Sequence, residues 1–196
     1  MKLWLLLLLL LPALLAGELA FEAETLDFRL ESLPAGGDTL LWTVSGDYYF
    51  SNLGQDPLSR PIWFPIPADS SAGRAEILDL SLIDPADSMS VELLKQNVQG
   101  LMFRLALPAR SFARLRLSYR QRVYGSEVRY ILKTANAWGR PLPHSTLNLF
   151  VSNSIELAGP PYPDPHLAPV PGGTRYLWQL PDFVPQSDFV VSIIRP

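Results

Sequence analysis

The sequence predicts an all-β domain, a two-sheet antiparallel β-sandwich that is immunoglobulin-like in architecture and has about ten strands. Apolar and polar residues alternate with a period of two along most of the chain, as in strands that bury one face. Turn residues, such as those of Pro34–Asp38 and Asp84–Asp87, separate nearly every alternating run. A sheet with one apolar face needs a second sheet to cover it, which favours a sandwich.

The first residues are typical of a secretory signal peptide. Met1-Lys2 precedes an apolar run that contains seven consecutive leucines, and small residues follow it. The run is too short to span a bilayer comfortably, since spanning takes about 20 residues. We predict a signal peptide over residues 1–17, with cleavage between 16 and 20, and a single domain over residues 18–196. An uncleaved N-terminal anchor is the alternative.

Composition narrows the classes of function. No later stretch is apolar and long enough to cross a membrane, so we expect an exported protein of the periplasm or the extracellular space. The chain has no cysteine, which excludes disulfides, thiol catalysis and thiolate metal sites. Its 16 Lys and Arg residues against 19 Asp and Glu residues are too even a balance to indicate a nucleic-acid partner.

The alternating segments can be followed in order. The first places Leu26, Phe28 and Leu30 on one face, and the second continues from Leu40 past Gly46, where we expect a bulge or bend. Prolines surround the third segment, so it is expected at a sheet edge, because proline cannot donate a ladder hydrogen bond. Further strands are predicted around residues 78–82, 91–93, 101–107, 115–123, 128–132, 147–151 and 176–180.

Two segments near the carboxyl end differ from this pattern. Residues 189–194 are apolar on both faces, which favours a central strand. Residues 159–173 hold six prolines and are expected to form a stiff, extended surface loop. This loop is either a rigid connector or a polyproline ligand for a partner.

Four arginines form a stripe: Arg114, Arg116, Arg120 and Arg122. Their even spacing puts all of them on one face of a strand. Guanidinium groups bind phosphate and carboxylate groups bidentately, so an anionic ligand is one hypothesis. The alternative is that acidic residues of neighbouring strands pair with them, each pair contributing about 0.2–1 kcal/mol.

Three aromatic residues are candidates for ligand binding. Trp63 is predicted on the outer face of an edge strand, Trp138 in a loop, and Tyr162 in the proline-rich segment. Exposed rings of this kind stack on sugars in carbohydrate-binding sandwiches. Alternatively, each ring covers an open end of the sandwich.

No catalytic residue, metal site or cofactor is predicted. The chain has two histidines, His144 and His166, both in proline-flanked segments that we expect to be loops, whereas a catalytic zinc site usually has three protein ligands. Nucleophile-elbow, His-Glu-x-x-His and phosphate-loop motifs are absent. A triad or a carboxylate pair assembled from scattered residues stays open.

The segment from Tyr130 to Trp138 reads Tyr-x-Leu-x-Thr-x-x-x-Trp. It resembles a strand-loop element of uncharacterised secreted bacterial β-sandwich families. That resemblance implies export and a sandwich fold, and it supplies no activity. We therefore expect a non-catalytic exported module that contacts a protein or envelope partner. The alternatives are a carbohydrate-binding module and a secreted hydrolase with scattered catalytic residues.

Overall fold

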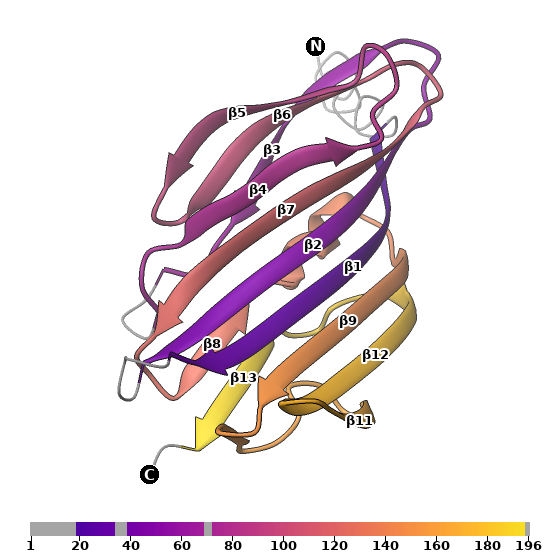
Figure 1. Ribbon diagram of the computed structural model, residues 1–196. Coiled ribbons are helices and arrows are strands. Elements are labelled where there is room, and N and C mark those ends of the chain that lie inside the picture. Colours follow the sequence, from indigo (N-terminus) through magenta and orange to yellow (C-terminus); the bar gives the residue numbers. More distant parts are fainter. Residues whose placement is uncertain (1–18, 34–38, 69–71, 195–196) are drawn as a thin grey trace, which may run out of the picture.

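The computed structural model describes residues 19–33, 39–68 and 72–194. In this part of the chain it contains 13 strands and one short 3-10 helix, and the sheets are packed together (Figure 1). This confirms the predicted all-β fold, with more strands than the expected number. The predicted signal peptide, residues 1–17, lies outside the described residues.

Seven strands form the large sheet, in the order β11-β12-β9-β1-β2-β7-β4. They are β1 (Leu19–Ser32), β2 (Leu40–Asn52), β4 (Glu76–Ile83), β7 (Phe112–Val123), β9 (Leu142–Ser152), β11 (His166–Val170) and β12 (Gly173–Phe183). Two three-stranded sheets have the orders β3-β6-β5 and β10-β13-β8. Their strands are β3 (Leu58–Pro65), β5 (Ser90–Asn97), β6 (Gly100–Leu107), β8 (Glu127–Tyr130), β10 (Glu156–Leu157) and β13 (Phe189–Ile194), and the helix is η1 (Lys133–Trp138).

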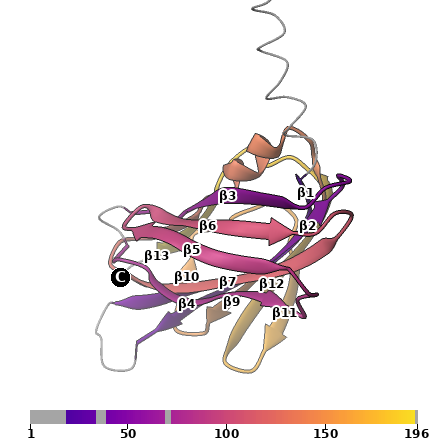
Figure 2. The same ribbon diagram turned by 90° about the horizontal axis from the view of Figure 1, so that it is seen from above.

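Both small sheets cover the same face of the large sheet, so the second layer of the sandwich is divided (Figures 1 and 2). Phe189 of β13 stacks on Phe28 of β1, with ring centroids 4.6 Å apart. Phe64 of β3 meets the ring of Tyr48 of β2 edge-on at 5.7 Å. The apolar rows predicted from alternation form one core between these layers. Its largest fully buried side chains are Trp42, Tyr119, Phe28, Phe103 and Phe189.

The large sheet contains a parallel pair, which differs from the expected antiparallel arrangement. Residues Ala23–Leu30 of β1 run parallel to His144–Val151 of β9, and every other strand pair in the described residues is antiparallel. Parallel neighbours need a long connection. Here the whole middle of the chain supplies it.

The bulge or bend expected at Gly46 is absent. Gly46 pairs in continuous register with Leu26 of β1 and Leu117 of β7. A Cβ at this position would clash with the hydroxyl oxygen and the ring of Tyr48. Glycine is therefore needed because the Tyr48 ring lies over it, and the irregularity of β1 falls instead between Phe21 and Ala23.

Prolines mark sheet edges as expected, with one correction. The proline-flanked strand β3 is an edge strand, and β13 is the central strand of its sheet. The predicted loop at residues 159–173 is wrong in its second half, where β11 pairs with β12 as a hairpin at the edge of the large sheet. Pro169 fits there because an edge strand has a row of ladder positions without a partner.

Candidate ligand-binding site

A cavity of about 540 Å³ lies at one end of the sandwich, where β1 begins and β2 ends. Its walls come from the large sheet, from β3 and β6, and from the segment that runs from the end of β8 to the end of η1. Figure 2 shows η1 beside β1 and β3. The lining is mostly apolar, and its aromatic members include Phe21, Tyr48, Phe50, Phe64, Tyr130 and Trp138.

The short helix η1 forms one wall of the cavity. Trp138, its last residue, packs against Phe21 and Phe50, with a centroid separation of 5.7 Å from each ring. Gly139 ends the helix in a left-handed conformation at φ 71°. Asn136 Nδ2 donates a 3.0 Å hydrogen bond to the carbonyl oxygen of Pro185, which ties the helix to the segment before β13.

One acidic side chain lines this apolar cavity. Glu24 lies on the core-facing row of β1, directly opposite Tyr48 of β2 and Ser145 of β9. It is 4% exposed, and Ser145 Oγ donates a 2.8 Å hydrogen bond to its Oε1. Among the described residues, no Lys, Arg or His side chain forms an ion pair with it. Burial raises the pKa of Glu24 to about 7, against the opposing effect of the Ser145 hydrogen bond.

Two tyrosine hydroxyls add to the polar part of the cavity, whose lining also includes Arg60 and Thr134. The hydroxyls of Tyr48 and Tyr130 are 2.8 Å apart and share a hydrogen bond. Burial raises the pKa of both phenols well above the usual value, and the Glu24 charge adds to this rise. Both groups therefore stay protonated, and they present a neutral hydroxyl pair close to a single carboxyl group.

The structure separates the three aromatic residues proposed from the sequence. Trp63 and Trp138 both line the cavity, and Trp63 is 40% exposed. Tyr162 lies elsewhere: its ring stacks on Phe189 at 6.0 Å, and its hydroxyl donates a 2.8 Å hydrogen bond to the carbonyl oxygen of Ser187. Two of the three thus meet at one cavity, while Tyr162 is built into the packing around β13.

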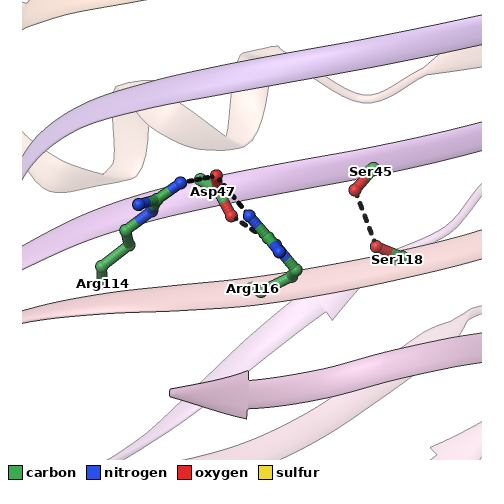
Figure 3. Close-up of polar contacts among 5 residues, drawn as sticks. All are labelled: Ser45, Asp47, Arg114, Arg116 and Ser118. Atoms are coloured by element: carbon green, nitrogen blue, oxygen red, sulfur yellow. Dashed lines mark hydrogen bonds and ion pairs between the residues drawn. The ribbon is translucent and has the colours of Figure 1, made fainter. Parts of the chain in front are cut away.

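The arginine stripe lies on the other face of the large sheet, away from the cavity. Figure 3 shows Asp47 of β2 between Arg114 and Arg116 of β7, both of which donate hydrogen bonds to its carboxylate. Arg120 binds Glu76 of β4 bidentately, at 2.8 and 3.0 Å. Three of the four arginines thus make the cross-strand pairs that were the alternative to anion binding. Beside the Asp47 cluster, the Oγ atoms of Ser45 and Ser118 are 2.8 Å apart (Figure 3).

Arg122 is the member of the stripe that forms no ion pair with a described residue. It lines a cavity of about 330 Å³ together with Arg74, Arg120 and Glu76. The hypothesis of an anionic ligand is thereby confined to this end of β7, because Arg114 and Arg116 are engaged with Asp47.

The two histidines lie on strands, which corrects the expectation that they are in loops. His144 is in β9 and His166 is in β11. Neither forms a hydrogen bond with a Ser, Asp or Glu side chain within residues 19–33, 39–68 and 72–194. The same residues include no group of three His, Asp or Glu side chains placed to hold a metal ion. They also include no helix with the length and apolar character of a membrane span.

Sequence reasoning missed Glu24, although a signal for it exists. Glu24 stands two residues before Leu26 and is therefore in phase with the apolar row of Leu26, Phe28 and Leu30. A carboxyl group in phase with such a row is expected to be buried, which is unusual without a partner. The cavity itself depends on which strands become neighbours, and alternation does not specify that.

Comparisons with known proteins identify the fold. No family model matches the chain, and no curated protein matches it. Among solved structures, it resembles a "putative nutrient binding protein" from Legionella pneumophila, with 14% identity, a TM-score of 0.68, and coverage of 90% of this chain and 67% of that one. It also resembles an M1 zinc metallopeptidase from Deinococcus radiodurans bound to a Tyr-Ser-Ala substrate, with 11% identity, a TM-score of 0.51, and coverage of 89% of this chain and 42% of that one. The chain thus spans less than half of the metallopeptidase, and at these identities the likeness shows a shared β-sandwich fold.

Proposed function

We propose that this protein is an exported, non-catalytic binding module that holds a small, largely apolar ligand in the cavity beside η1. The observation that carries the proposal is the cavity itself. Its volume of about 540 Å³ and its aromatic walls match small-molecule sites, which typically measure about 300–1,000 Å³ and contain a few convergent polar groups. Here those groups include the Glu24 carboxyl and the hydroxyls of Tyr48 and Tyr130.

Two further observations support this role. The similar protein from Legionella pneumophila is described as nutrient binding, which agrees with a binding module. The hydroxyls of Tyr48 and Tyr130 bond to each other, and the Glu24 carboxyl accepts its hydrogen bond from Ser145. Ser145 is not among the residues that line the cavity, so the hydroxyl group bonded to this carboxyl does not face a ligand there. Export is proposed from the leader-like pattern of residues 1–17.

The test is a titration with the neutral fluorescent probe N-phenylnaphthylamine, followed by its emission and by tryptophan quenching. We expect saturable binding of the probe at one site. The probe should also quench tryptophan emission, because Trp138 and Trp63 line the cavity. Ala135→Phe places a ring into the cavity wall and should abolish binding. Ala86→Phe, the same change on an exposed turn, should leave it intact. The absence of saturable binding, or equal binding by both variants, would contradict the proposal.

A carbohydrate ligand is the second candidate, and the exposed ring of Trp63 at the same cavity favours it. Sugars stack on open ring faces, so their binding should depend on Trp63 and not on filling the interior with Ala135→Phe. A glycan array separates the two candidates. Binding that is lost in Trp63→Ala and kept in Ala135→Phe would favour the sugar. If the protein instead recognises a protein or envelope partner over this surface, neither the N-phenylnaphthylamine titration nor the glycan array should show binding.

A further inference from the structure

Among the residues that the structure describes, Glu24 has no partner of opposite charge, and it lies in a part of the molecule where a charge is costly. It occupies a core-facing position of β1 between Tyr48 and Ser145, and its side chain is almost completely buried. An ionised carboxyl group in such a place destabilises the fold unless a cation pairs with it. A leucine would continue the apolar row at no such cost. The carboxyl also borders the cavity, so a molecule in the cavity can reach it.

The surroundings of Glu24 are suited to a cation that carries apolar groups. Aromatic rings attract cations positioned over their faces within about 6 Å of the centroid. The cavity gathers Phe21, Phe50 and Trp138 into one cluster, with Tyr48 at 6.2 Å from Phe21. Ring faces and a buried carboxylate together replace the water that an ammonium group loses on entry.

We infer that the cavity binds an organic cation, an ammonium group attached to an apolar body, and that Glu24 supplies the opposite charge. This inference deepens the proposed function and rests on it. Glu24 is the binding residue for the ammonium group, and Ser145 is a positioning residue that holds the carboxyl group by its hydrogen bond to Oε1.

Other ionisable groups around the carboxyl fit this assignment. Tyr48 of β2 and Tyr130 of β8 face it as neutral phenols, and Ser145 of β9 faces it as a hydrogen-bond donor. Arg60 lines the same cavity from β3, and its charge is not among the causes that shift the pKa of Glu24. Arg60 also forms no ion pair with a described residue. It is therefore free to meet a carboxylate at the far end of a zwitterionic ligand.

The experiment compares benzyltrimethylammonium with neopentylbenzene, its neutral analogue with carbon in place of nitrogen, by calorimetric titration of the whole protein. We expect the cation to bind at least about tenfold more tightly than the neutral analogue. Glu24→Gln keeps the shape of the side chain and should remove this preference. Glu31→Gln, on the same strand and paired with Arg29 outside the cavity, is the matched control and should keep it.

Proton release gives an independent readout. At about pH 6 the carboxyl is largely protonated, given its pKa of about 7, so a bound cation should expel the proton. The measured heat should then depend on the ionisation enthalpy of the buffer, and this dependence should vanish in Glu24→Gln. Affinity for the cation should rise by up to about tenfold per pH unit below pH 7 and level off above it. Affinity for the cation that falls as pH rises would overturn the inference, because it would show that the cation binds better when Glu24 is protonated than when it is ionised.

Comparison of phenethylamine with phenylalanine identifies the source of the ammonium group. Tighter binding of phenylalanine that is lost in Arg60→Gln would indicate a zwitterion, and equal or weaker binding would indicate a simple amine. Equal affinity for benzyltrimethylammonium and neopentylbenzene would overturn the inference and leave the proposed binding function standing. If N-phenylnaphthylamine, benzyltrimethylammonium and neopentylbenzene all fail to bind, the inference and the proposed binding function are both overturned.

Discussion

The two faces of the large sheet shift the pKa of a carboxyl group in opposite directions. Glu24 of β1 is opposite Tyr48 of β2, and the next pair in the register joins Thr25 to Asp47. Asp47 faces outward between two arginines, whereas Glu24 faces inward with only a serine hydrogen bond. Partial burial acts to raise the pKa of Asp47, but the hydrogen bonds from Arg116 and Arg114 outweigh it and hold that pKa below the usual value. Burial instead raises the pKa of Glu24.

The two carboxyl groups differ in whether the protein itself supplies a partner of opposite charge. Asp47 is satisfied within the protein, because it joins two positions of β7 to β2. Glu24 is left without a counter-charge in the described residues, and it borders a cavity. A carboxyl that strengthens the sheet and one that we propose as a ligand-binding group thus lie in adjacent register positions of the same strand pair.

The largest expected effect is on the pH dependence of stability. The pKa of Glu24 is raised from 4.5 to about 7 in the folded protein. The stability that protonated Glu24 contributes is therefore fully present below pH 4.5 and is lost as pH rises through about 7. The ligand-free protein should therefore lose about 3 kcal/mol of unfolding free energy across this range. Glu24→Gln should abolish most of that loss, as measured by urea unfolding at several pH values. A variant with the same pH dependence as the wild type would contradict the raised pKa.

The next effect concerns the hydroxyl pair on the inner face. Tyr130→Phe removes one partner of the 2.8 Å bond and leaves the buried Tyr48 hydroxyl unsatisfied. The expected cost is about 1–2 kcal/mol of unfolding free energy, because a buried hydroxyl without a partner loses its hydration. Urea unfolding measures it. In the double variant with Tyr48→Phe, no unsatisfied hydroxyl remains, so the second change should cost less than it does alone.

On the outer face, Asp47→Asn should have a smaller effect. The change removes the charge that Arg114 and Arg116 share, and it should lower Tm by about 2–4 °C at low salt. The pKa of Asp47 is lower in the folded protein than in the unfolded chain. The stability that ionised Asp47 contributes is therefore present above the unfolded-state pKa and is lost as pH falls through the folded-state pKa. The difference from the wild type should therefore shrink in acid and in high salt. A difference that persists in molar salt would contradict an ionic origin.

The smallest effect is expected for Arg120→Gln. Arg120 and Glu76 form a bidentate pair, but both side chains are exposed, at 47% and 59%. Exposed pairs are screened by solvent and contribute little. Thermal unfolding should not distinguish this variant from the wild type, and a clear loss of stability would show that the outer stripe acts as one connected network.

Much of this arrangement could be predicted from the sequence, because alternation reports which face a residue is on. It placed Leu26, Phe28 and Leu30 inside and the arginines outside, and the prolines around Ile62 indicated an edge strand. Alternation does not report which strands become neighbours. It therefore could not predict that β1 pairs in parallel with β9, or that Trp63 and Trp138 line the same cavity. The sequence predicts a bulge or bend at Gly46 because it does not show that the ring of Tyr48 covers this residue.

The parallel pairing of β1 with β9 has a consequence for how the chain folds. Asp27 and Asn148, which bond across this pair, are 121 residues apart. Pairings so distant in sequence form slowly, because a long stretch of chain must close on itself first. Until residues 142–152 arrive, one edge of β1 presents unpaired backbone groups that can join another molecule. We expect chains truncated before β9 to aggregate, since the first strand has to wait for the last third of the protein.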